Sequence, residues 1–146
     1  MAEVKICGLS EERHVAAAVD AGARFLGFVF FPKSPRAVTP TQAAALTAEV
    51  PVGVARVGLF VDPSDDLLRE VLDHAALDVI QLHGHESAGR VAEVKALTGL
   101  PVMKAVGLSG PADLPQLMDY GVAADMLLVD AKPPAAVSYT HLRAHE

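Results

Sequence analysis

The feature that most constrains the fold is a regular alternation of short apolar runs with Ala- and Leu-rich helical patterns. The apolar runs cover residues 4–7, 25–30, 54–61, 78–82, 102–106 and 126–129, and helical patterns lie between them near 11–21, 40–49, 65–75, 86–98 and 112–120. The apolar runs are almost continuous, which is typical of parallel strands covered by helices. Short connections between strand and helix imply right-handed βαβ units in one parallel sheet.

Two architectures share this pattern, an open doubly wound sheet and a closed (β/α)₈ barrel. The last strand starts in the series are spaced 24 residues apart in a chain of 146 residues. Eight units of about 24 residues would need roughly 190–200 residues, near the lower end for the barrel. Length by itself therefore favours the open sheet.

Residues at the ends of the helical patterns indicate where helices begin and end. Thr39-Pro40-Thr41-Gln42 is a capping box with proline at the first helical position. Asp62-Pro63 is expected to begin the third helix in the same manner. Three glycines that follow helical runs are expected to end them with a positive φ: Gly22, Gly99 and Gly121.

Composition excludes several classes of partner. The chain is 51% hydrophobic and 21% charged, with a net charge of −6 and scattered basic residues. Nucleic acid and anionic membrane surfaces are therefore not expected as partners, and no apolar run is long enough to span a membrane. The single cysteine, Cys7, excludes an internal disulfide or a cysteine zinc site. No signal peptide is evident, so a cytoplasmic location is expected.

Polar residues collect where the predicted strands end. In either parallel architecture this carboxyl edge of the sheet is where ligands bind. The residues expected there are Cys7, Arg36, Asp62, Gln81, His83, Lys104 and Asp130.

The segments VKICGLS at 4–10, GFVFFPKSPRAV at 27–38, VGLFVD at 57–62, IQLHG at 80–84 and LLVDAKPP at 127–134 resemble phosphoribosylanthranilate isomerases. The resemblance implies a (β/α)₈ barrel in tryptophan biosynthesis that needs no cofactor and no metal. It implies an Amadori rearrangement of N-(5′-phosphoribosyl)anthranilate to the 1-deoxyribulose phosphate. Opening the furanose ring requires an acid, and removing the C2′ proton requires a base.

The resemblance also assigns roles to individual residues. Cys7 is expected as the general base and Asp130 as the general acid. Arg36 is expected to hold the anthranilate carboxylate, a role that suits a planar bidentate donor. Gln81 and His83 are expected to position the substrate. Lys5, two residues from Cys7 along a strand, should point to the same side of the sheet and assist the thiolate.

Other interpretations of the same residues remain open. Cys7 taken alone is a small buried hydrophobic residue, Arg36 a solvated surface group, and Asp62 a helix cap. Lys104, inside an apolar strand, either points inward or is a paired residue of a packed layer. For the chain as a whole, the alternative interpretation is a non-catalytic open-sheet α/β ligand-binding module. A barrel such as indole-glycerol-phosphate synthase fits less well, because ICG and VDAK do not match its lysine-based pattern.

The family pattern continues beyond the sixth strand, and this chain departs from it there. Residues 1–137 are expected to form a partial (β/α)₈ barrel of six βα units. Residues 138–146 do not fit the family and are expected to be an artefactual tail, the alternative being a divergent C-terminus. The chain is thus expected to be an inactive or weakly active fragment of an enzyme that, at full length, is a monomer or homodimer.

Overall fold

The computed structural model describes residues 2–131, in which six strands alternate with five α-helices. The tail predicted at 138–146 lies outside the described residues. The elements are β1 (Lys5–Ile6), α1 (Glu12–Asp20), β2 (Phe25–Val29), α2 (Pro40–Ala48), β3 (Ala55–Phe60), α3 (Asp65–His74), β4 (Val79–Leu82), α4 (Ala88–Thr98), β5 (Val102–Leu108), the 3-10 helix η1 (Pro111–Asp113), α5 (Leu114–Ala123) and β6 (Met126–Ala131).

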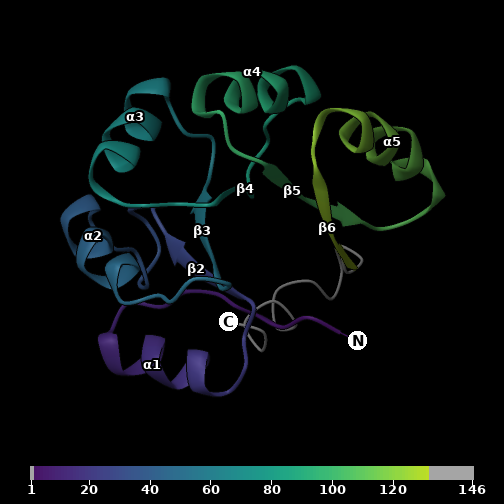
Figure 1. Ribbon diagram of the computed structural model, residues 1–146. Coiled ribbons are helices and arrows are strands. Elements are labelled where there is room, and N and C mark those ends of the chain that lie inside the picture. The colour runs from purple at the N-terminus through teal and green to yellow at the C-terminus, as the bar shows by residue number, and fades with distance from the viewer. Residues whose placement is uncertain (1, 132–146) are drawn as a thin grey trace.

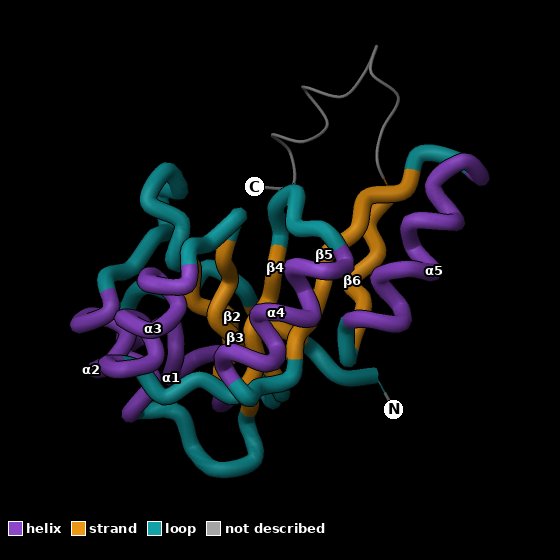
Figure 2. Tube along the Cα trace, turned by 90° about the horizontal axis from the view of Figure 1, so that it is seen from above, coloured by secondary structure: helices purple, strands orange, loops and turns teal. Residues whose placement is uncertain are grey.

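All six strands are parallel and pair in chain order, from β1 at one edge to β6 at the other. Figure 1 shows the sheet curling while the helices surround its outer side, and Figure 2 shows the same arrangement from above. A doubly wound sheet reverses its strand order and carries helices on both faces. The open doubly wound alternative is therefore wrong, and the predicted barrel-type α/β fold is confirmed.

Strand register separates two apolar layers. On the concave face, Val57, Val79 and Met103 form a small cluster with Phe25 and Met126. On the outer face, side chains of the alternate parity pack against the helices in a larger core. This outer core includes Leu26, Phe28, Phe60, Ile80, Leu82, Val102 and Val106 from the strands, and Val15, Leu46, Leu68, Val71, Val91 and Val94 from the helices.

Most helix ends follow the local sequence signals. Both reciprocal hydrogen bonds of the capping box join Thr39 and Gln42, at 3.1 and 2.9 Å, and Gly99 ends α4 with φ 69°. Two predictions are wrong. Helix α3 is capped by Ser64 and not by Asp62, because Ser64 has the extended backbone that lets its hydroxyl accept the N–H of Leu67. Gly121 lies inside α5, which continues to Ala123.

Two aspartates tie neighbouring strands together at the amino edge of the sheet. Asp78, just before β4, accepts hydrogen bonds from Arg56 N, Nε and Nη2 at 2.8, 2.9 and 3.0 Å. Asp125, just before β6, accepts from Lys95 Nζ at 2.8 Å and from Val102 N at 2.9 Å. These hydrogen bonds lower the pKa of both carboxyl groups. The bonds from Arg56 and Val102 link a strand to the start of its neighbour and so help to set the register, whereas the bond from Lys95 links α4 to the start of β6.

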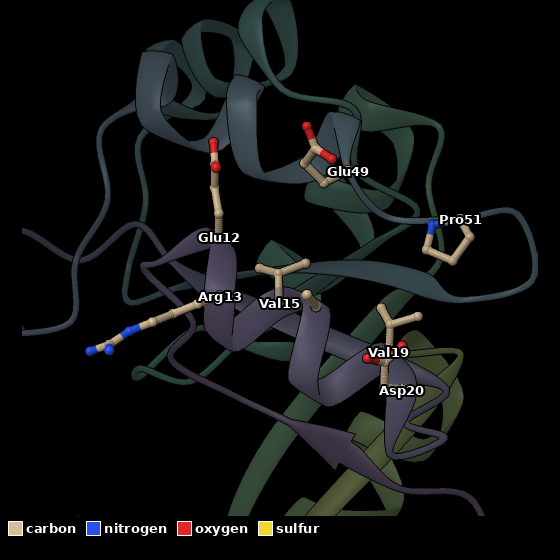
Figure 3. Close-up of a pocket in the computed structure, with 8 residues that line it drawn as sticks. Glu12, Arg13, Val15, Val19, Asp20, Glu49 and Pro51 are labelled. Atoms are coloured by element: carbon tan, nitrogen blue, oxygen red, sulfur yellow. The ribbon is translucent and has the colours of Figure 1, made fainter.

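A groove in the outer helix layer lies between α1 and the segment that follows α2. Figure 3 shows Val15 and Val19 at its floor, with Glu12 and Glu49 at its sides. It is separated from the concave face by the sheet. None of the helices within residues 2–131 is long and apolar enough to cross a membrane.

Candidate active site

The register brings five of the predicted site residues to the concave face of the sheet. Gln81 pairs with Met103, which belongs to the concave cluster, and His83 lies two residues further on. Lys5 pairs with Phe25 of the same cluster, and Cys7 follows it by two residues. Because side chains alternate along a strand, this register assigns Lys5 and Cys7 to the same, concave face.

Asp130 occupies the equivalent position on the last strand. Met126 belongs to the concave cluster, and Asp130 lies four residues beyond it on β6. The even spacing puts the Asp130 carboxylate on the concave face near the carboxyl end of its strand. The register therefore assigns the predicted base and acid to one face, with Cys7 directly after edge strand β1 and Asp130 on edge strand β6.

A tight turn surrounds Cys7. The N–H groups of Gly8 and Leu9 both donate to Gly27 O at 3.0 Å, which fixes the end of β1 against β2. Gly27 has no side chain, and a Cβ there would lie 3.0 Å from Cys7 Sγ. The glycine therefore leaves the space that the partly exposed thiol occupies.

Arg36 lies next to this turn, although its loop is exposed and follows β2. Gly8 has φ 83°, and a Cβ there would lie 2.6 Å from Arg36 Nη1. The loop is held by Val38 N donating to Val29 O at 2.9 Å and by Arg36 N donating to Ser34 Oγ at 3.2 Å. The structure thus brings the guanidinium group beside the residue that follows Cys7.

Gln81 and His83 extend from β4 toward the same mouth. Gln81 is 1% exposed, and its Nε2 lies 3.5 Å from His83 Nδ1. Among the described residues, Gln81 Oε1 is buried without a hydrogen-bond partner. A buried acceptor without a partner carries a desolvation cost, which a donor on a bound ligand would remove.

Charges from both edges of the sheet act on His83. Partial burial of the ring lowers the pKa of His83, and the positive charges of Lys104 and Lys5 lower it further. The carboxylates of Glu86 and Asp130 oppose this shift. The lowered pKa favours the neutral imidazole at neutral pH. That charges on β1 and β6 both act on the residue directly after β4 reflects the curl of the sheet.

Glu86 and Lys104 form a buried ion pair that the sequence alone did not predict. Lys104 Nζ donates to Glu86 Oε1 at 2.7 Å, and the two side chains are 2% and 1% exposed. Lys104 has the outer parity of Val102 and Val106, so it faces the helices and lies 5.2 Å from the centre of the Tyr120 ring. A lysine in an apolar strand signals a buried partner. Nothing in the local sequence identifies Glu86 as that partner.

Asp62 belongs to the loop beside this pair. Its backbone φ is 45°, which is uncommon for a residue with a side chain. Its carboxylate accepts the N–H of His85 at 2.9 Å, and a Cβ on Gly84 would lie 2.7 Å from Asp62 Oδ2. Asp62 therefore joins the loops after β3 and β4. Within residues 2–131, His, Cys, Asp and Glu side chains form no group of three or more that could hold a metal ion.

Comparisons with known proteins identify one family that this chain resembles. A family model described as N-(5′-phosphoribosyl)anthranilate isomerase matches residues 4–138. The N-(5′-phosphoribosyl)anthranilate isomerases of Paracoccus denitrificans and Cereibacter sphaeroides are 70% and 54% identical over 131 residues, 90% of this chain. The chain spans 61% and 62% of the length of those two relatives.

Solved structures agree. The phosphoribosyl anthranilate isomerase of Thermotoga maritima superposes with a TM-score of 0.83 at 34% identity, covering 92% of this chain and 64% of that one. A structure of such an enzyme in complex with reduced 1-(o-carboxyphenylamino)-1-deoxyribulose 5-phosphate gives 0.81 at 33% identity, covering 90% and 66%. The family model matches a segment that includes both Cys7 and Asp130. This chain therefore belongs to the phosphoribosylanthranilate isomerase family.

Proposed function

We propose that the chain carries the acid and base of a phosphoribosylanthranilate isomerase, with N-(5′-phosphoribosyl)anthranilate as substrate. The observation that carries the proposal is the shared register of Lys5, Cys7, Gln81, His83 and Asp130 on the concave face. These five residues belong to or directly follow three separate strands, β1, β4 and β6, and barrel enzymes bind their ligands at the carboxyl ends of such strands.

In the proposed reaction, the Asp130 carboxyl group protonates the furanose ring oxygen. The C1′–O bond breaks, and the anthranilate nitrogen forms a Schiff base with C1′. The Cys7 thiolate then removes the C2′ proton, and the electron pair moves toward the nitrogen to give an enolamine. Tautomerisation of the enolamine yields the ketone. The sugar undergoes an internal redox change, so no external oxidant is consumed.

The remaining residues position the substrate. Arg36 binds the anthranilate carboxylate, which its location beside Gly8 supports because that turn directly follows Cys7. Gln81 Oε1 accepts a hydrogen bond from a sugar hydroxyl, which its lack of a partner among the described residues supports. Lys5 lies two residues from Cys7 on the same face of the sheet and binds the substrate through its ammonium group.

The test uses a chimera, called here the extended chain. It consists of residues 1–131 joined to the part of the Paracoccus denitrificans relative that the match leaves uncovered. Turnover is followed by the change in anthranilate fluorescence. We expect Cys7→Ala and Asp130→Asn each to lower kcat by about 10²–10⁴-fold, the usual contribution of a general acid or base. Asp119→Asn, an exposed carboxylate on α5, is the matched control and should leave kcat unchanged.

A non-catalytic binding module gives a different result. It would bind the reduced product analogue but show no turnover in the extended chain.

We also propose that the complete protein is cytoplasmic and a monomer or a homodimer. One similar structure, at 32% identity, is described as monomers generated from the dimeric isomerase of Thermotoga maritima. Light scattering of the extended chain would decide between the two states.

A further inference from the structure

Glu86 joins four parts of the fold through one short segment. Its Oε2 accepts the N–H of Asp62 at 2.7 Å, and its Oε1 accepts the N–H of Gly84 at 2.9 Å and Lys104 Nζ at 2.7 Å. Its backbone carbonyl accepts the hydroxyl of Tyr120 from α5. One carboxylate thus connects the loops after β3 and β4 to strand β5.

The same ion pair holds the peptide groups that follow His83 from both sides. Gly84 N donates to Glu86, and Gly84 O accepts from Lys104 Nζ at 2.8 Å. Among residues 2–131, the hydrogen bonds of His83 itself are its N–H, which donates to Phe60 O at 2.9 Å, and the contact of its ring with Gln81. The position of the imidazole therefore depends on the bonds made by its neighbour Gly84.

The pair lies on the helix side of the sheet, away from the concave face. Lys104 points into the helix layer, and both side chains are almost fully buried. Stability alone does not explain the pair, because well-packed apolar residues often replace a buried ion pair without loss of stability. Apolar residues could not accept the two backbone N–H groups or donate to Gly84 O. What the pair provides is a fixed backbone next to His83.

We propose that Glu86, with Lys104 as its buried counter-ion, is a positioning residue that holds His83 in place at the mouth of the candidate site. The inference rests on the proposed function, since it concerns a residue expected to position that substrate. It assigns no contact with substrate to Glu86 or Lys104. Their effect on turnover passes through His83.

The test is a double-mutant cycle in the extended chain. The pair variant combines Glu86→Gln with Lys104→Met, which leaves no unpaired buried charge and so keeps the fold. Lys104→Met removes the hydrogen bond to Gly84 O. Glu86→Gln leaves one acceptor oxygen in place of the two of the carboxylate. The pair variant is measured alone, His83→Ala is measured alone, and the two are then combined. Glu93→Gln, an exposed ion-pair partner on α4, is the matched control.

We expect the pair variant to lower kcat/KM by about 10–100-fold, the order expected for a small misplacement of a positioning group. In the His83→Ala background the same change should lower it by roughly threefold at most, because both changes act through one residue. Equal losses in the two backgrounds would overturn the proposal and indicate a general structural role. Glu93→Gln should leave kcat/KM unchanged.

A second measurement does not depend on turnover. Nitrogen-15 NMR of the imidazoles reports the pKa of His83, with exposed His14 and His74 as internal references. The facing charges are Lys104 on β5, Glu86 in the loop after β4, Lys5 on β1 and Asp130 on β6, and Lys104 has the largest effect among them. Because the variant removes Lys104, which lowers this pKa, together with Glu86, which raises it, the readout is a shift of the His83 ring signals at a pH at which the ring stays neutral. Unchanged His83 signals would overturn the positioning role, whereas absent turnover in the parent with shifted signals would overturn only the proposed function.

Discussion

Breaking the buried Glu86–Lys104 pair should destabilise the protein far more than removing both partners. With 2.7 Å between Nζ and Oε1, Coulomb's law at an effective dielectric of about 20 gives roughly 6 kcal/mol as an upper bound. Desolvation of both groups opposes this attraction, since the side chains are 2% and 1% exposed. Either single change leaves the other charge buried without its partner.

We therefore expect Glu86→Gln and Lys104→Met each to lower the free energy of unfolding by about 3–5 kcal/mol. For Glu86→Gln, the loss of unfolding free energy should lie near the lower end of this range. The stranded ammonium group keeps Gly84 O at 2.8 Å and the Tyr120 ring at 5.2 Å. The double change should cost less than either single change, about 1–2 kcal/mol, for the weakened bonds to Asp62 N and Gly84 N.

The assay is urea unfolding of the extended chain at neutral pH, followed by far-ultraviolet circular dichroism. The exposed pair Arg90–Glu93 serves as the control, because its carboxylate is 70% exposed and its nitrogen and oxygen lie 3.3 Å apart. Glu93→Gln should cost less than about 1 kcal/mol. If the double change costs as much as the two single changes added together, Glu86 and Lys104 do not stabilise each other and the reasoning fails.

Three further outcomes follow from the contacts described. Gly27→Ala should lower kcat of the extended chain, because the new Cβ lies 3.0 Å from Cys7 Sγ and 3.2 Å from Cys7 Cα and so displaces Cys7; unchanged kcat would argue against Cys7 as the base. Asp78→Asn should cost about 1 kcal/mol at neutral pH, screening by solvent included. Because Arg56 lowers the pKa of Asp78 below its ordinary 3.8, this stabilisation is present above about pH 4 and disappears as the pH falls through the lowered pKa. Urea titrations of both proteins at several pH values would detect it, and a constant difference would contradict it. Thr39→Ala should lower the melting temperature through a loss of about 1 kcal/mol from the capping box, and an unchanged melting temperature would count against that hydrogen bond.

Local patterns in the sequence are sufficient to predict the elements. Each expected strand and helix lies within a few residues of an observed one, because apolar continuity and capping act over neighbouring residues. The capping box at Thr39 is confirmed for the same reason. The two errors at helix ends are local conflicts that packing decided. Ser64 and Asp62 both suit a cap, and α5 continues past Gly121 to Ala123.

The strand-end residues of the candidate site were also predictable, since every parallel strand delivers its carboxyl end to the same edge. Their shared face follows from period-two alternation, as for Lys5 and Cys7. The roles of Cys7 and Asp130 remain predictions that the proposed variants test. The location of Arg36 beside Gly8 required the structure, because the loop that carries it has no periodicity.

What the sequence by itself determined is the set of elements, the parallel sheet and the family, all of which depend on residues close together in the chain or on whole motifs. Only the tertiary structure decided that the sheet curls, that Lys104 faces the helices and that Glu86 is its partner. Those partners are 18 residues apart, and Tyr120 reaches Glu86 across 34 residues. A buried charge requires a partner, but only the folded chain determines which residue is near enough to be that partner.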